Sequence, residues 1–297
     1  MKKAVEQSVK ALCYVGLFLG MQSVLSSILS FVYGMQIGYE SAASGVMPGA
    51  EELNQMVMDK IMAQSTWVVL ISGVLSILAL WIFCKIRKKN MIKETQFVKF
   101  APKYIPCVAM IGIAYCIGLN FTMSCLPGGI LDAYMEKASN ITDSSIIVTI
   151  ISTMIVAPVV EELIFRGMIF SRLKKGMPLA WAVILTAIMF GLCHGQIVWT
   201  IYTFVLSVLL CIAVQKTGSS VSALLMHVLF NVFGVFVPML LPEEYPIAVN
   251  LAIAVIAFIV MAIALVWLLK MPTAVCEEDS EAGTEENMKE NEMQEES

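Results

Sequence analysis

Long apolar stretches constrain this chain more than any other feature of its sequence. Eight of them approach or exceed the roughly 20 residues that a helix needs to cross the hydrocarbon core of a bilayer. They lie at about 11–34, 65–84, 105–125, 145–170, 178–195, 197–215, 220–241 and 246–269. Because a backbone in lipid must satisfy its polar groups within the structure, such stretches favour helices. The sequence therefore predicts an all-α fold, a polytopic membrane helical bundle of about eight transmembrane helices.

The composition also indicates a protein embedded in a lipid bilayer. The chain is 59% hydrophobic and 14% charged, whereas soluble domains carry roughly 25% charged residues. The eight cysteines form no CxxC pair and lie mostly inside apolar runs, so we interpret them as small buried hydrophobes. The first apolar run is longer than the roughly 7–15 residues of a signal-peptide core, which predicts an uncleaved first span.

Basic residues gather in the loops that follow spans two, four and six. These residues are Lys85, Arg87, Lys88, Lys89, Lys93, Lys99 and Lys103, then Arg172, Lys174 and Lys175, then Lys216. The loops on the opposite side are acidic or nearly neutral. Short Lys/Arg-rich loops stay in the cytoplasm, so we expect a multi-pass protein of the plasma membrane with both termini cytoplasmic. Bases beside membrane spans give no support to a nucleic-acid partner.

The chain divides into four parts on this reading. Residues 1–104 hold the first two spans and a basic cytoplasmic loop, residues 105–245 hold the membrane core, and residues 246–276 hold the last span. Residues 277–297 contain ten acids and one Lys. So few apolar residues cannot form a core, which predicts a disordered acidic tail.

Very few ionisable side chains lie within the predicted spans. They are Glu161, Glu162, Arg166, His194 and His227. A charge at the bilayer centre costs roughly 2.5–3.5 kcal/mol on insertion scales, and such residues normally face the interior and mark a functional path. We therefore expect these side chains, which come from three spans, to share one polar site.

Spacing suggests how these side chains are used. Glu162 and Arg166 are four residues apart, the favourable arrangement for a helical ion pair. Glu161 is rotated by about 100° on an α-helix, so its carboxylate stays available as a general base. His194 follows Phe190 by four residues.

Asn231 follows His227 by four residues, so a second imidazole and a carboxamide lie on one face of the same predicted helix. A carboxylate and an imidazole can deprotonate water, while an imidazole and a carboxamide can donate to an oxyanion. These groups suit peptide hydrolysis without a covalent nucleophile.

Other interpretations of the same residues stay open. The acids and Arg166 could form a structural charge network, and buried Glu, His and Arg sets also build proton relays in transporters. No repeated halves typical of many transporters are visible. Glu161, His194 and His227 could also serve as a two-His, one-carboxylate set for a divalent metal such as zinc, although no HExxH motif is present.

The ordered patterns Glu161-Glu162-x-x-x-Arg166, Phe190-x-x-x-His194 and His227-x-x-x-Asn231 resemble the CPBP family of membrane proteases. This family includes the CAAX prenyl endopeptidases and the bacterial Abi proteins linked to bacteriocin processing and immunity. The resemblance covers roughly residues 105–245. It implies that this segment is the catalytic membrane core.

The resemblance also implies a role for each residue. Glu161 with His194 would activate the attacking water, and His227 with Asn231 would form the oxyanion hole. Glu162 and Arg166 would support them. Members have been described both as metalloproteases and as glutamate-type proteases, so the resemblance leaves a zinc cofactor open.

The function expected from the resemblance is intramembrane endopeptidase activity on a membrane-associated peptide or protein, such as a prenylated protein or a bacteriocin precursor. The alternatives are a catalytically silent immunity or scaffold protein of the same fold and a proton-coupled transporter.

Overall fold

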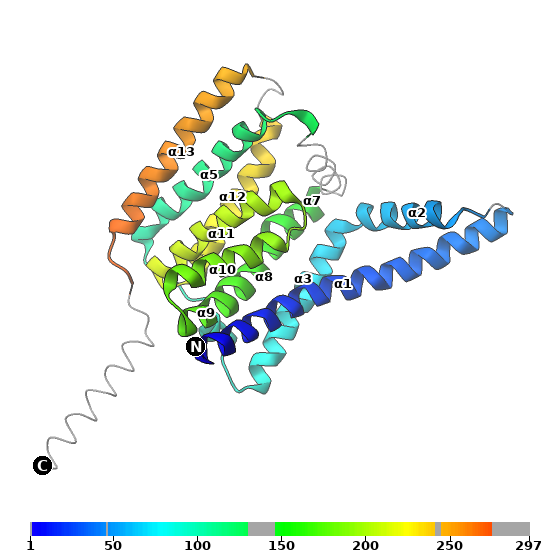
Figure 1. Cartoon of the computed structure of the whole chain (residues 1–297), viewed down its shortest axis with the longest axis horizontal. Helices are drawn as coiled ribbons and strands as arrows, with labels where there is room; N and C mark the ends of the chain where they lie inside the picture. Colours follow the sequence, from blue (N-terminus) through cyan, green and yellow to red (C-terminus); the bar gives the residue numbers. More distant parts are fainter. Residues whose placement is uncertain (1, 46, 130–145, 241–244, 275–297) are drawn as a thin grey trace, which may run out of the picture.

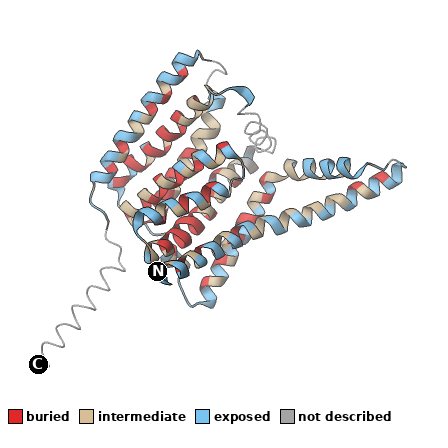
Figure 2. Cartoon of the chain, viewed as in Figure 1, coloured by how far each residue is buried: buried red, intermediate tan, exposed pale blue. Residues whose placement is uncertain are grey.

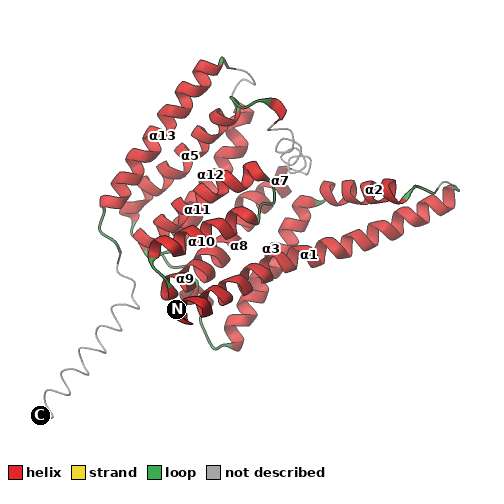
Figure 3. Ribbon diagram, viewed as in Figure 1, coloured by secondary structure: helices red, strands yellow, loops and turns green. Residues whose placement is uncertain are grey.

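The computed structural model of the chain describes residues 2–45, 47–129, 146–240 and 245–274. In these ranges every regular element is a helix (Figure 3). The first are α1 (Lys2–Ser44), α2 (Ala50–Ala63), α3 (Ser65–Ile86), α4 (Met91–Glu94), η1 (Pro102–Tyr104) and α5 (Ile105–Met123). Then come α7 (Ile146–Thr149), η2 (Ile150–Val156), α8 (Ala157–Glu161), η3 (Glu162–Phe170) and α9 (Ser171–Gly176). The last are α10 (Leu179–Leu192), α11 (Ile197–Thr217), α12 (Ser220–Leu240) and α13 (Ile247–Lys270). The all-α prediction is confirmed, and the predicted acidic tail at 277–297 lies outside the described residues.

Six described helical segments are long and apolar enough to cross a membrane. They are α1, α3, η1 with α5, α11, α12 and α13. The predicted span at 145–170, whose first residue is not described, corresponds to the continuous run from α7 into η3. The predicted span at 178–195 contains the 14-residue helix α10, which is about 21 Å long. The chain is therefore polytopic, and the number eight remains a prediction.

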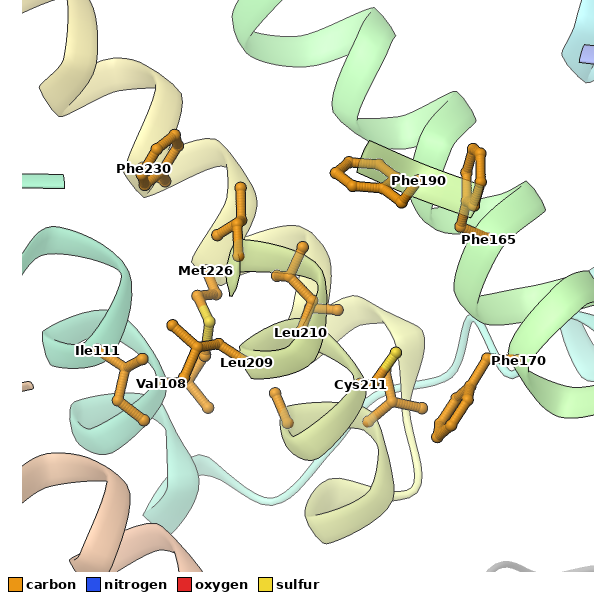
Figure 4. Close-up of a cluster of buried hydrophobic side chains, with 14 of the residues drawn as sticks. Val108, Ile111, Phe165, Phe170, Phe190, Leu209, Leu210, Cys211, Met226 and Phe230 are labelled. Carbon is orange, nitrogen blue, oxygen red and sulfur yellow. The ribbon is translucent and has the colours of Figure 1, made fainter. Parts of the chain in front are cut away.

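The elements that carry the predicted site pack in the middle of the bundle. α12 lies against η2, α8, η3, α11 and α5, while α13 covers the other side of α5 (Figure 1). Buried residues concentrate on η3, α5 and α11, and α10 and α12 pack their buried faces against them (Figure 2). Their apolar side chains interlock between these helices, as Phe165, Phe190, Leu210 and Met226 show (Figure 4). The site is thus held by the best-packed part of the protein.

One close contact sets the position of α12. A Cβ atom added to Gly112 on α5 would lie 2.6 Å from the carbonyl oxygen of Met226. Real Cβ atoms do not approach a backbone oxygen this closely, so only glycine at position 112 allows α5 and α12 to pack at this distance. Met226 immediately precedes His227, so this packing fixes the part of α12 that carries the histidine.

The first helices form an arm that extends away from the bundle (Figure 1). α1 has 43 residues and is about 65 Å long. Its first half packs on η3 and α9, with Phe18 edge-on to Phe165 at 5.8 Å between ring centroids. Its second half runs beside α2, where the Lys60 ammonium lies over the Tyr33 ring. The arm therefore joins the bundle through the N-terminal half of α1 and through α3, which contacts η2 and α8.

The run from α7 to α9 alternates between α and π geometry. The π-helical stretches η2 and η3 flank the five-residue α8, and Pro158 is the second residue of α8. π turns pair residue i with i+5 and occur frequently at functional sites. The helix therefore changes register just before Pro158, and Glu161 and Glu162 lie at the next such change.

Basic loops meet at one end of the bundle. Glu94 accepts hydrogen bonds from Lys89 at 2.7 Å and from Arg172, which joins the 85–103 segment to α9. Burial opposes ionisation of Glu94, but the Lys89 hydrogen bond and the Arg172 charge hold its pKa below the usual value. Ser220 Oγ, just after the loop that carries Lys216, donates to the Thr95 carbonyl next to Glu94 at 2.8 Å and so adds the third basic loop to the same end.

Candidate active site

Glu162 lies at the centre of the ionisable cluster. Its side chain is fully buried, and its Oε1 accepts a hydrogen bond from Arg166 Nη1 at 3.0 Å. The same oxygen is 2.8 Å from His227 Nδ1. Because a carboxylate can only accept, His227 carries a proton on Nδ1. One oxygen of Glu162 thus connects the first motif with the third.

Arg166 is fully buried and is held from three sides. The predicted ion pair with Glu162 is confirmed. Arg166 Nη2 also donates to Ser207 Oγ at 2.9 Å, and the guanidinium lies over the Phe190 ring, 4.5 Å from its centroid. A buried charge is tolerated only with such partners. Arg166 therefore locks Glu162 in one orientation.

The second nitrogen of His227 points to the other glutamate. His227 Nε2 lies 3.7 Å from Glu161 Oε2. Glu161 is less buried than its neighbour, with 16% of its side chain exposed, against 0% for Glu162. The carboxylate left over by the ion pair is therefore the one that faces His227 and stays partly accessible, as the spacing predicted.

His194 lies just beyond the end of α10, in the turn that leads to α11. Its Nδ1 is 2.8 Å from the Phe190 carbonyl oxygen. A carbonyl oxygen only accepts, so Nδ1 carries the proton and Nε2 of the neutral ring is the nitrogen able to take one up. Gly195 follows with φ of 71°, a left-handed conformation that closes the turn into α11.

Phe190 links the second motif to the others. Its ring makes edge contacts with His194 at 4.9 Å and with His227 at 5.9 Å between centroids, in addition to its contact with Arg166. Both histidines therefore contact the same aromatic ring. The predicted convergence of the three motifs is seen in these contacts.

The Asn231 side chain donates to the protein backbone, in addition to the expected role as an oxyanion donor. Its Nδ2 donates to the Thr153 carbonyl oxygen on η2 at 2.9 Å. One N–H of the amide is thus taken by the backbone, and the second remains for another acceptor. Asn231 lies one turn after His227 on α12, on the side that faces η2 and α8.

Two contacts of the cluster escaped the sequence reasoning. Ser207 shares its span with other hydroxyl residues, among them Thr200 and Thr203, so the sequence alone gives no reason to select it. Phe190 was noted only through its spacing to His194, because nothing in the sequence places its ring over Arg166. Both contacts join residues distant in the chain and depend on tertiary packing.

The proposed metal set was tested against the side-chain geometry. In the described ranges, no group of three or more His, Cys, Asp and Glu side chains is arranged to hold a metal ion. His227 Nδ1 is bonded to Glu162, and His194 Nδ1 is bonded to a carbonyl. Donation of Nδ1 to a carboxylate or a carbonyl is also the pattern of metal-binding histidines, which ligate through Nε2, so these bonds do not decide whether the site holds a metal.

Comparison with known proteins gave one finding. Residues 143–233 match the family model described as Type II CAAX prenyl endopeptidase Rce1-like. The matched segment contains Glu161, Glu162, Arg166, His194, His227 and Asn231. No curated protein and no solved structure matched the chain.

Proposed function

Because residues 143–233 of this chain belong to the CPBP family, within its Rce1-like CAAX prenyl endopeptidases, we propose that the protein is an intramembrane endopeptidase that hydrolyses peptide bonds of a membrane-associated substrate. The observation that carries this proposal is the position of His227 between the two glutamates. Glu162 fixes its Nδ1 at 2.8 Å, and Glu161 faces its Nε2 at 3.7 Å. The site lies between α8, η3, α10 and α12 in a helical membrane protein.

Glu161 and His194 act on the attacking water in this proposal. The water oxygen attacks the scissile carbonyl carbon while its proton passes to the Glu161 carboxylate. The neutral His194, protonated at Nδ1 by its hydrogen bond to Phe190, accepts or returns a proton at Nε2. When the C–N bond breaks, the departing amine takes a proton from this pair, so the charges balance at the end of the cycle.

His227 and Asn231 face the oxygen of the tetrahedral intermediate. Donation from His227 Nε2 requires the doubly protonated ring, since Nδ1 already donates to Glu162. Asn231 has its second N–H for the same oxygen. No metal is needed for these steps.

The proposed orientation places both termini in the cytoplasm, within the plasma membrane. The support is the contact of the basic loops at one end of the bundle, through Glu94 with Arg172 and through Thr95 with Ser220. The N-terminus reaches the same end, because Gly176 of α9 packs against Ala4 and Gln7. We also propose the division at residues 104, 245 and 276, since the family match falls inside 105–245.

We infer from the family description that a prenylated C-terminal peptide is the first substrate to test. The experiment uses purified protein in liposomes with a farnesylated peptide, its unprenylated counterpart and a bacteriocin-precursor peptide, with products mapped by mass spectrometry. Cleavage at one defined bond supports the proposal. A second experiment compares the membrane peptides of cells that carry the natural protein with those of cells that carry Glu161→Ala. If the folded, inserted protein cleaves none of the three peptides and the two peptidomes do not differ, the protein is a catalytically silent immunity or scaffold protein. Flux that depends on Glu161 without hydrolysis would indicate a transporter.

A further inference from the structure

The residues that follow α13 are fastened to the bundle by hydrogen bonds. The Ala274 amide donates to the Lys216 carbonyl at 2.9 Å. The Tyr104 hydroxyl donates to the Pro272 carbonyl at 2.6 Å. The chain therefore leaves the described part of the protein from a fixed point at the basic end of the bundle, and residues 275–297 continue from there.

Three exposed lysines lie near this point, and we call them the anchor lysines. Lys270 is the last residue of α13. Lys103 immediately precedes Tyr104, and its ammonium lies 5.1 Å from the centroid of that ring. Lys99 belongs to the segment whose backbone carbonyls accept hydrogen bonds from the serines after Lys216. All three are exposed, and none forms an ion pair with a described carboxylate.

The residues that continue the chain carry the complementary charge. Residues 277–297 contain ten acids and one Lys, and they lie outside the described residues. The acids begin with Glu277, Glu278 and Asp279, only three to five residues after Ala274. Three residues of chain span at most about 11 Å, so the first acids cannot leave the neighbourhood of the anchor lysines. A partner tethered by so short a linker has an effective concentration of roughly millimolar.

The basic end of the bundle offers few carboxylates of its own to these lysines. Glu94 is already bonded to Lys89 and Arg172. We propose that the surface formed by the anchor lysines binds residues 277–297 of the same chain through ion pairs. Anionic lipid headgroups are the rival occupant, because basic residues beside a span attract them. The fixed exit of the chain favours its own acids, and the proposal does not depend on the proposed hydrolysis.

The first experiment is zero-length cross-linking of the full natural chain in nanodiscs that hold one copy in neutral lipid. A carbodiimide joins a lysine only to a carboxylate that touches it, and mass spectrometry maps the links. We expect links between the anchor lysines and the acids of 277–297 at low salt. They should disappear at about 1 M salt, where the Debye length falls to about 3 Å. Absence of these links at low salt would overturn the proposal.

The same experiment in nanodiscs that contain phosphatidylserine separates the two occupants. Acids tethered beside the lysines should keep their links in the anionic bilayer. If the links disappear there, lipid headgroups occupy the anchor lysines in a natural membrane, and the proposal is wrong.

The second experiment measures binding of a labelled synthetic peptide of residues 277–297 to the full chain in neutral nanodiscs. The natural chain should bind it weakly, because its own acids compete. The freed chain carries four substitutions in this segment: Glu277→Gln, Glu278→Gln, Asp279→Asn and Glu281→Gln. We expect the freed chain to bind the peptide roughly 5- to 100-fold more tightly, the sum of a few exposed ion pairs. Equal affinity of the two chains would contradict the proposal.

Lysine substitutions in the freed chain locate the surface. Replacing the three anchor lysines with glutamine should abolish the gain in affinity. The matched control removes the same charge at the end of α3 and on α4: Lys85→Gln, Lys88→Gln and Lys93→Gln. Because α3 ends well away from the end of α13 (Figure 1), this control should change the affinity by less than about 2-fold at 0.1 M salt. Equal losses in the two triple variants would show that the peptide responds only to net charge, and the assigned surface would be wrong.

Discussion

Glu162 Oε1 and His227 Nδ1 lie 2.8 Å apart although 65 residues separate them in the chain. The contact joins η3 to α12 and sets which nitrogen of His227 bears the proton. Glu162 also accepts a hydrogen bond from Arg166, which holds the buried carboxylate in place. This carboxylate in turn fixes the orientation of His227. Glu162 is therefore the residue through which the first and third motifs act together.

Substituting Glu162→Gln tests this relationship. The amide keeps the shape but can donate to Nδ1, so His227 adopts the wrong tautomer. We expect kcat to fall by about 10²- to 10⁴-fold, the range seen when orienting carboxylates beside catalytic histidines or metal ligands are lost. Kinetics on the reconstituted protein measure the effect, with Glu40→Gln on the exposed part of α1 as control. Equal activity of both variants would refute the orienting role.

Substituting Gly112→Ala tests whether helix spacing supports the site. The added Cβ would lie 2.6 Å from the Met226 carbonyl oxygen, so α5 and α12 must separate and His227 moves. Overpacking of this kind costs about 1–3 kcal/mol, and the misplacement should reduce kcat by about 10- to 100-fold.

Gly234→Ala on α12 is the matched control for this substitution. Its Cβ would meet only Cys116 Sγ, at 3.7 Å, an ordinary contact. We expect natural turnover and an unchanged unfolding midpoint for this variant. If Gly112→Ala also shows natural turnover, the close contact does not position His227.

Metal removal distinguishes the two mechanisms that the motifs left open. In the metal-free account, Glu161 and His194 activate the water without a Lewis acid, so it predicts full activity after dialysis against a strong chelator. Elemental analysis of the purified protein should find less than one equivalent of zinc. Activity that disappears with chelator and returns with added zinc would favour the metalloprotease mechanism.

Much of this architecture could be predicted from hydropathy and spacing. Apolar stretches located the long helices, and four-residue spacing predicted the ion pair of Glu162 with Arg166 and the pairing of Phe190 with His194. These features are local, so the period of the helix determines them. The convergence of the motifs followed from the cost of isolated charges in lipid.

The remaining features depend on packing between helices. Hydropathy and four-residue spacing do not distinguish π from α pairing, so η2 and η3 could not be placed from the sequence. The contacts of Ser207 with Arg166 and of Asn231 with Thr153 span 41 and 78 residues. The extension of α1 to Ser44 was also missed, because its last residues are too polar to belong to a span.

The most direct test of the central claim is the turnover of Glu161→Gln. The amide cannot take a proton from water, so product formation should fall by at least about 10²-fold, while insertion, yield and unfolding midpoint stay at natural values. The measurement is single-turnover cleavage of a peptide that the natural protein hydrolyses. Cleavage by Glu161→Gln at the natural rate would show that Glu161 is not the base and would contradict the proposed mechanism.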